Sequence, residues 1–330
     1  MTLTIEADAG RLAVVPSPIP LLPSAVVSHA EREIADGRLV RVRRGVLAPA
    51  AAWADLAPWN RYTARVHAVA MTHPDAVFCL ESAAALLGAP IFGHPREVHV
   101  LDLPSANARL SGGVRCHTTR QDRLVVEAGG LFVTSVVDTA VDISRARHGA
   151  LALAVADASL RRDPSASVEA LVARNESRLS KRGRRMARWP LHRATPDAET
   201  ALESLSRAVI EWLGFDEPAL QKDFRTNGVL DRCDMWWEGA RVIGEADGEL
   251  KYDGSLQPPA EAIRKEKARD RRLLAHADRV VHWGWAEVVQ VDPLREILRR
   301  AGLRQRRPES SRELYALTAL LGRRSSPTAP

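Results

Sequence analysis

The chain has 330 residues, of which 45% are hydrophobic and 27% charged, a balance typical of a folded globular protein and not of a disordered chain. This length predicts two or three domains, since it exceeds what one small core needs. The formal net charge of +6 favours a polyanionic partner. No apolar run approaches the roughly 20 residues of a membrane-spanning helix, and no basic segment opens the chain as in a signal peptide. We therefore expect a soluble, cytoplasmic protein with no membrane partner. Its three cysteines lack CxxC spacing, and we expect them to be reduced thiols.

Residues 1–24 end in the proline-rich run VPSPIPLLPS and are expected to form an irregular tail. Residues 25–60 follow with a short helix, a turn at Asp36-Gly37 and two strands joined by a basic turn. A helix followed by a basic β-wing is the end of a winged helix-turn-helix domain, in which basic side chains meet phosphates. The candidate nucleic-acid-binding residues of this wing are Arg38, Arg41, Arg43 and Arg44. The alternative interpretation is a solvated, arginine-rich hairpin that makes no DNA contact.

Residues 61–170 alternate helix and strand signals and predict an α/β middle domain. SAAALLG is typical of a helix that ends at glycine, and REVHVLDLP alternates like a strand. LFVTSVVDTAVDISR runs from a strand into a helix, with Thr134 or Ser135 as its N-cap. Three histidines of this region lack the spacing of metal ligands, and we interpret them as surface or internally hydrogen-bonded residues. They are His94, His99 and His117.

Residues 171–194 are densely basic and are expected to form a linker helix. Such a run is either a solvated face or an electrostatic rail for a nucleic acid backbone, and composition does not separate the two. Its candidate nucleic-acid-binding residues are Arg182, Arg184 and Arg185. At the other end of the chain, residues 306–330 predict one short helix and a disordered tail.

Residues 195–305 form the last predicted domain and carry a constellation of acids. TPDAETALESLSRAVIEWLG predicts a helix that begins near Thr195 and includes Glu203. Two strands then meet at a turn, in a register that places Asp234, Glu245 and Asp247 on one face of a sheet. Clustered carboxylates repel one another unless a cation lies among them, and a hard divalent ion such as Mg²⁺ or Mn²⁺ prefers oxygen ligands. The sequence therefore predicts a metal site at these three acids, with Glu203 reaching in from the helix.

The next predicted helix, PAEAIRKEKARDRRLLAHAD, carries charges on its expected inner stripe. Ile263 and Leu274 are eleven residues apart and point the same way, together with Lys267 and Asp270. Either this stripe borders a polar pocket, or Lys267 and Asp270 form an internal ion pair. RVVHWGWAEV then predicts a strand, followed by a helix, and the chain has no Walker motif, GxGxxG fingerprint or nucleophile elbow.

In these blocks the chain resembles the PD-(D/E)XK nuclease fold, in the group related to very-short-patch-repair (Vsr-like) endonucleases. The blocks are LESLSR, DMWWE, GEADGELKY and EKARDRRLL, which cover about residues 195–300. The resemblance implies a Mg²⁺-dependent DNA endonuclease in which Asp234 and Glu245 hold the metal. The family signature has a lysine where this chain has Asp247, so Lys251 or Lys267 must supply the cation if the domain is catalytic.

The front of the chain resembles the AbiEi-type antitoxins of type IV toxin–antitoxin systems. GRLVRVRRGVLAP is similar to their winged-helix end, and SAAALLG and TSVVDTAVDI to their following domain. The resemblance implies DNA as a partner and leaves open a cognate toxin. Three interpretations of the whole chain stay open: a metal-dependent endonuclease, a non-catalytic DNA-binding regulator or antitoxin, and a protein-interaction scaffold. In fold class, we expect a winged-helix front, an α/β middle and a restriction-endonuclease-like domain, α+β overall.

Overall fold

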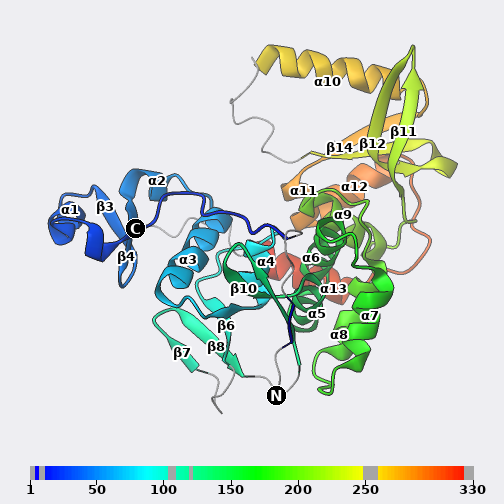
Figure 1. Cartoon of the computed structure of the whole chain (residues 1–330). Coiled ribbons are helices and arrows are strands. Elements are labelled where there is room, and N and C mark those ends of the chain that lie inside the picture. Colours follow the sequence, from blue (N-terminus) through cyan, green and yellow to red (C-terminus); the bar gives the residue numbers. More distant parts are fainter. Residues whose placement is uncertain (1–3, 7–11, 103–108, 119–121, 248–258, 323–330) are drawn as a thin grey trace. The chain divides into compact units, whose positions relative to one another are not determined.

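The computed structural model describes residues 4–6, 12–102, 109–118, 122–247 and 259–322. Within these stretches the chain forms thirteen α-helices and three β-sheets, which confirms the mixed α and β class. None of the described helices has the length and apolar character needed to cross a membrane. The chain divides into two compact units, shown with the elements labelled in Figure 1. The first is Met1–Arg147 with Ala158–Ala194, and the second is His148–Asp157 with Thr195–Pro330.

The first unit begins with a small antiparallel sheet in the order β2-β4-β3. Its elements are β2 (Leu22–Pro23), a 3-10 turn (Ser24–Val26), α1 (Ala30–Ala35), β3 (Leu39–Arg43), β4 (Val46–Pro49) and α2 (Ala50–Ala54). The expected helix, basic turn and hairpin are confirmed. Gly45, at φ +87°, makes the turn between the strands, a conformation that side-chain-bearing residues rarely adopt. Ala48 of β4 packs with Ile19 and Ala64 to form a local core.

The larger sheet of the first unit has seven strands in the order β1-β9-β10-β5-β6-β8-β7. Its elements are β1 (Thr4–Glu6), α3 (Pro58–Thr72), β5 (Val77–Phe78), α4 (Leu80–Leu86), β6 (Val98–Asp102), β7 (Arg109–Ser111), β8 (Val114–Thr118), β9 (Leu124–Ala128), β10 (Leu131–Thr134) and α5 (Val136–Ala146). The N-terminal tail is thus not wholly irregular, because β1 pairs in parallel with β9 and β2 joins the small sheet. Of the two expected caps of α5, Ser135 is the one that accepts the hydrogen bond from the Asp138 N–H, at 3.1 Å.

The basic segment 171–194 is not one linker helix. It contains the end of α7 (Val168–Ser177) and all of α8 (Arg184–Arg193), and α6 (Gly149–Arg162) precedes them. Arg174 and Arg178 turn inward and bind the buried Asp138 of α5 at 2.6 and 2.5 Å. Asp138 therefore neutralises part of the positive charge of this segment inside the first unit, because a buried arginine requires an acidic partner.

The second unit is built around a four-stranded sheet in the order β11-β12-β13-β14. Its elements are α9 (Ala201–Trp212), β11 (Ala219–Thr226), β12 (Val229–Trp237), a 3-10 turn (Glu238–Ala240), β13 (Val242–Ala246), α10 (Pro259–Leu273), β14 (Arg279–Trp283), α11 (Trp285–Gln290), α12 (Asp292–Arg300) and α13 (Ser311–Gly322). Strand β12 is antiparallel to both β11 and β13, and β14 lies parallel to β13. The predicted order of helix, hairpin, helix, strand and helix is confirmed, with β11 and α11 in addition.

Two helices cover opposite faces of this sheet (Figure 1). On one face, Leu273 and Ala277 pack with Trp236 and Ile243 and hold α10. On the other face, the indole N–H of Trp283 donates to Ser206 of α9 at 2.8 Å. A Cβ on Gly244 would lie 2.4 Å from the Trp283 ring, so only glycine fits this strand position. The register Met235↔Gly244 places Asp234 and Glu245 on one face of the sheet, as the hairpin predicted.

Helix α9 is shorter than predicted. It begins at Ala201 and not near Thr195, because Thr200 is its N-cap and accepts a hydrogen bond from the Glu203 N–H at 3.1 Å. The hydroxyl of Thr195 instead accepts from the N–H of Asp197 in the preceding turn. The later cap places Glu203 in the first turn of the helix.

Candidate functional site

Glu245 lies near the end of β13 with its side chain only 3% exposed. The parallel register of β13 and β14 pairs it with His282. The antiparallel register with β12 brings Asp234 to the same end of the sheet, where its Oδ2 accepts a hydrogen bond from the Ala246 N–H at 2.9 Å. Two of the predicted metal ligands therefore share one site.

The environment of Glu245 disfavours the charged form of its carboxyl group. Burial raises the pKa of Glu245 to about 7, and the negative charge of Asp234 contributes to the increase. Arg269 of α10 opposes it, with its guanidinium Nη1 3.0 Å from Glu245 Oε2. A carboxyl group with a pKa near neutrality binds or releases a proton in response to nearby charge, a property that clusters at functional sites.

Glu203 of α9 interacts electrostatically with Asp234. Its side chain is buried, and Oε2 accepts hydrogen bonds from the Glu199 N–H and from Gln221 Nε2, both at 2.9 Å. Burial raises the pKa of Glu203, the bond from the Glu199 backbone lowers it, and the charge of Asp234 raises it further. Asp234 is thus coupled electrostatically to both glutamates.

Asp247 is joined to these acids through a histidine. His282 Nδ1 lies 2.6 Å from Asp247 Oδ2, and His282 Nε2 lies 3.4 Å from Asp270 Oδ2 on α10. The hydrogen bond with Asp247 raises the pKa of His282 most, while burial opposes it and Asp270 and Glu245 add to the increase. Among the described residues, the buried atoms Asp270 Oδ1 and His282 Nε2 have no hydrogen-bond partner. A small ligand or water at this point would satisfy both.

The predicted inner stripe of α10 is wrong. Lys267 is exposed, and Leu274 is 49% exposed. The stripe is centred on Leu273 instead, which is fully buried, and one residue along a helix is a rotation of about 100°. This rotation turns Arg269, four residues before Leu273, toward Glu245. The side chain of Asp270 contacts His282 and not Lys267. Lys251, the other predicted cation, lies outside the described residues.

Sequence reasoning missed Arg269 and His282. Arg269 was hidden in a helix with many charges, where an error of one residue in the stripe changes which cation faces inward. His282 could have been found only from the register of β14 with β13, and parallel strands joined by a helix carry no turn that fixes their register. Their partners Glu245 and Asp247 were predicted site residues, whereas Asp270 was expected only as a possible ion-pair partner of Lys267.

The acids at this site could hold a divalent cation only if water and substrate supplied most of its ligands. No group of three or more His, Cys, Asp or Glu side chains among the described residues could hold a metal ion. Mg²⁺, however, usually keeps several waters and takes one or two protein carboxylates together with substrate phosphates. Asp234 and Glu245 fit that mode, because two carboxylates with water and a substrate phosphate can complete the shell of the ion.

In the first unit, the four arginines of the expected wing lie in different environments. Arg38 binds Glu33 at 2.6 Å and also contacts Asp36, and Arg41 binds Glu31 at 2.5 Å. Arg43 is partly buried, and this burial lowers its pKa. Arg44 is exposed at the hairpin turn. Helix α1 therefore neutralises part of the hairpin's charge, which leaves Arg44 the best placed of the four to meet a phosphate.

The three predicted arginines of the basic segment also differ. Arg184 donates to the backbone carbonyl of Arg178, and its Nε is buried, so this side chain braces the loop before α8. Arg182 and Arg185 are exposed. Only these two are placed to contact an external polyanion.

No family model, no curated protein and no solved structure matches the chain. Function is therefore inferred from the geometry of the sites.

Proposed function

We propose that the second unit is a divalent-metal-dependent phosphodiesterase domain of the PD-(D/E)XK type that acts on DNA. The observation that carries the proposal is the buried Glu245 beside Asp234 on two adjacent strands. Glu203, on the helix that precedes the sheet, is coupled electrostatically to Asp234. The order α9, three antiparallel strands, α10 and a parallel β14 supports the proposal, since it extends the sequence blocks on which the resemblance to Vsr-like endonucleases depends.

In this proposal Asp234 and Glu245 hold Mg²⁺ or Mn²⁺, completed by water and the substrate phosphate. The bound ion would supply a nucleophilic water at neutral pH and offset charge on the leaving oxygen. Glu203 keeps Gln221 and the α9 N-terminus fixed beside Asp234. Asp247 holds the His282 ring by its Nδ1, which fixes the direction of Nε2 toward Asp270.

A cation near the scissile phosphate is still required, because the clustered carboxylates would otherwise repel a phosphodiester. Arg269 is the described side chain that lies at this cluster. Its planar guanidinium can keep one contact with Glu245 while another N–H meets a phosphate oxygen. Lys251 remains the second candidate, by its place four residues after Asp247 in the sequence.

A non-catalytic DNA-binding regulator or antitoxin is the alternative function. One observation favours it: the Arg269 guanidinium already neutralises Glu245, so the fold is consistent without a metal. In that case the first unit would bind DNA through Arg44 and its neighbours, and a toxin would be a further partner. Cleavage separates the two functions, because only the first consumes the substrate.

The experiment is incubation of the full chain with supercoiled plasmid, linear duplex, single-stranded DNA and RNA. Each is tested with Mg²⁺, with Mn²⁺ and with EDTA. We expect cleavage of DNA that needs a divalent ion and is abolished by EDTA. Binding of DNA without cleavage under any of these conditions would favour the regulator, and binding of neither nucleic acid would exclude both functions.

A further inference from the structure

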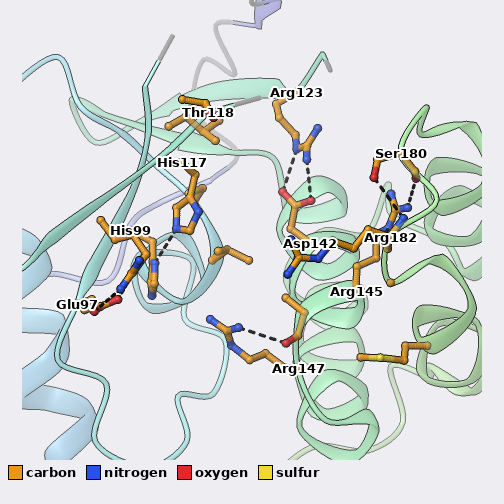
Figure 2. Close-up of a pocket in the computed structure, with 17 residues that line it drawn as sticks. Glu97, His99, His117, Thr118, Arg123, Asp142, Arg145, Arg147, Ser180 and Arg182 are labelled. Carbon is orange, nitrogen blue, oxygen red and sulfur yellow. Dashed lines mark hydrogen bonds and ion pairs between the residues drawn. The ribbon is translucent and has the colours of Figure 1, made fainter. Parts of the chain in front are cut away.

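A second concave site lies wholly within the first unit. It is a pocket with a volume of about 870 Å³ between the strands that carry His99 and His117 and the helical side formed by α5 and the segment before α8 (Figure 2). Its size falls within the range of about 300–1,000 Å³ that is typical of small-molecule sites. The proposed nuclease site, which lies in the other unit, shares no residue with it.

Arginine dominates the polar lining of this pocket. Five arginines line it, against the two carboxylates of Glu97 and Asp142. They are Arg115, Arg123, Arg145, Arg147 and Arg182. Even with Glu81, which pairs with Arg147 from outside the lining, five guanidinium groups meet three carboxylates. The excess charge is positive, and in a concave site it is focused on whatever enters.

Three of the arginines are paired, and the pairs fix the walls. Arg115 donates to Glu97 at 2.7 Å, and Arg147 donates to Glu81 at 2.9 Å. Arg123 lies 2.9 Å from Asp142. That acid is also 3.3 Å from the buried Arg178, which lies outside the pocket lining, so its charge is offset by two cations.

The other two arginines have no acidic partner within salt-bridge distance among the described residues. Arg145 donates only to the backbone carbonyls of Ser180 and Arg182. Burial lowers the pKa of Arg145, and the like charge of Arg184 lowers it further, so an anion beside it would relieve both effects. Arg182 is exposed, and the Figure 2 view shows it on the same side as Arg145.

Two histidines supply hydrogen bonding on the opposite wall. His99 Nδ1 and His117 Nε2 share a hydrogen bond of 2.9 Å, drawn in Figure 2, and His99 Nε2 lies 3.5 Å from Glu81. These interactions, together with the Arg147–Glu81 ion pair, hold both histidine rings in place. Apolar side chains, among them Leu80, Leu101 and Met186, complete the lining. The pocket thus combines arginines that have no carboxylate partner among the described residues with apolar side chains.

We propose that this pocket binds a phosphorylated small molecule of about nucleotide size. Arg145 and Arg182 meet the phosphate, because a guanidinium fork matches its oxygens and neither has a carboxylate partner among the described residues. His117 faces the ligand from the sheet, and Leu80 and Met186 cover its less polar part. A free oxyanion such as inorganic phosphate shares the first part of this chemistry but not the second.

The test is calorimetric titration of the full chain in EDTA, which removes any contribution of a metal site in the second unit. The probes are AMP, ATP, inorganic phosphate and a short single-stranded oligonucleotide. We expect the nucleotides to bind, inorganic phosphate to bind more weakly, and Arg182→Ala to weaken nucleotide binding about tenfold, as for one charge-assisted hydrogen bond. Arg182→Glu should weaken it more. Because Arg182 is exposed, both variants should unfold at the wild-type temperature.

Arg185→Ala is the matched control, since Arg185 is also exposed, three residues away, and does not line the pocket. It should bind nucleotide as the wild type does. His117→Gln is a second variant on the opposite wall, and it should also weaken binding. No binding of AMP or ATP at millimolar concentration overturns the proposal. So does equal binding by the Arg182 and Arg185 variants, and so does binding of the oligonucleotide alone, which would make this surface part of a nucleic acid path.

Discussion

Arg269 of α10 and Glu245 of β13 form a salt bridge of 3.0 Å in which the carboxylate is almost fully buried. The pair joins the helix to the sheet at the point where the predicted metal ligands meet. It also means that the same carboxylate serves two partners in our proposal, the arginine in the free protein and a divalent ion in the active complex.

Removal of Arg269 should destabilise the fold in a pH-dependent way. The pKa of Glu245 in the folded protein, about 7, is above its ordinary value, so its stabilising contribution is complete below pH 4.5 and lost as the pH rises through 7. Without Arg269 a charged Glu245 loses the cation that forms a salt bridge with it. We expect Arg269→Met to lower the free energy of unfolding by about 2–3 kcal/mol at pH 8, and by less at pH 5, where Glu245 is protonated. Urea unfolding at both pH values measures this.

The control for this prediction is Arg271→Met, an exposed position on the same helix. It should change the free energy of unfolding by less than about 0.5 kcal/mol at either pH. An equal loss for Arg269→Met at pH 5 and pH 8 would show that the arginine acts through packing and not through the charge of Glu245.

The two predicted lysines should behave differently from Arg269. Lys267 is exposed, so Lys267→Met should leave the free energy of unfolding within about 0.5 kcal/mol of the wild type. Lys251→Met should leave folding and Mn²⁺ affinity intact and abolish cleavage if Lys251 supplies the catalytic cation. Cleavage at the wild-type rate by the Lys251 variant would assign that role to Arg269, and calorimetry with Mn²⁺ checks that each variant still binds metal.

DNA affinity of the first unit should depend on Arg44 more than on Arg41. Both are exposed, but Arg41 is bound to Glu31, so its charge is already partly matched. We expect Arg44→Ala to weaken DNA binding and to reduce the slope of log affinity against log salt by up to about 0.9, the value for one phosphate contact. Arg41→Ala should change the slope less. Fluorescence anisotropy over a range of salt concentrations tests both, and equal slopes for all three proteins would mean that the hairpin makes no phosphate contact.

Acid should destabilise the first unit through its histidine pair. Burial, together with the charges of His99 and Arg115, lowers the pKa of His117 to about 4, below its value of about 6.5 in an unfolded chain. Stability from His117 is therefore present above pH 6.5 and lost as the pH falls toward 4. His117→Gln cannot titrate and should flatten the loss of thermal stability over that interval. An unchanged pH profile would show that other groups, such as His99, account for the loss.

The sequence predicted the elements of the second unit better than the contacts between them. The hairpin register follows from one turn, so Asp234 and Glu245 could be placed together from the order of residues alone. The position of Glu203 on a helix could also be predicted, although the helix begins later than expected. His282 could not be placed, because its register with Glu245 depends on how α10, which connects the two strands in sequence, packs on the sheet. The choice between Lys267 and Arg269 depends on helix rotation, which Leu273 fixes by packing on Trp236 and Ile243.

In the first unit the sequence did not predict which charged side chains pair with each other. The sequence shows two arginine-rich segments in this unit, but it does not reveal which arginines are paired. Arg178 is buried and Arg174 is partly buried, and both bind Asp138, which is 36 residues from Arg174 in the chain. The pocket was missed altogether, because its arginines come from one strand, one helix and three connecting segments, and only the fold brings them to one surface.

The central claim is that Glu245 belongs to a metal-dependent phosphodiesterase site. The most direct measurement is the initial rate of plasmid cleavage in Mn²⁺ for the wild type, for Glu245→Gln and for the exposed control Glu238→Gln. We predict that the wild type and Glu238→Gln cleave at the same rate, and that Glu245→Gln is slower by about 100-fold or more, since it loses a metal ligand. Cleavage by Glu245→Gln at the wild-type rate, or no cleavage by the wild type with any divalent ion, would contradict the account.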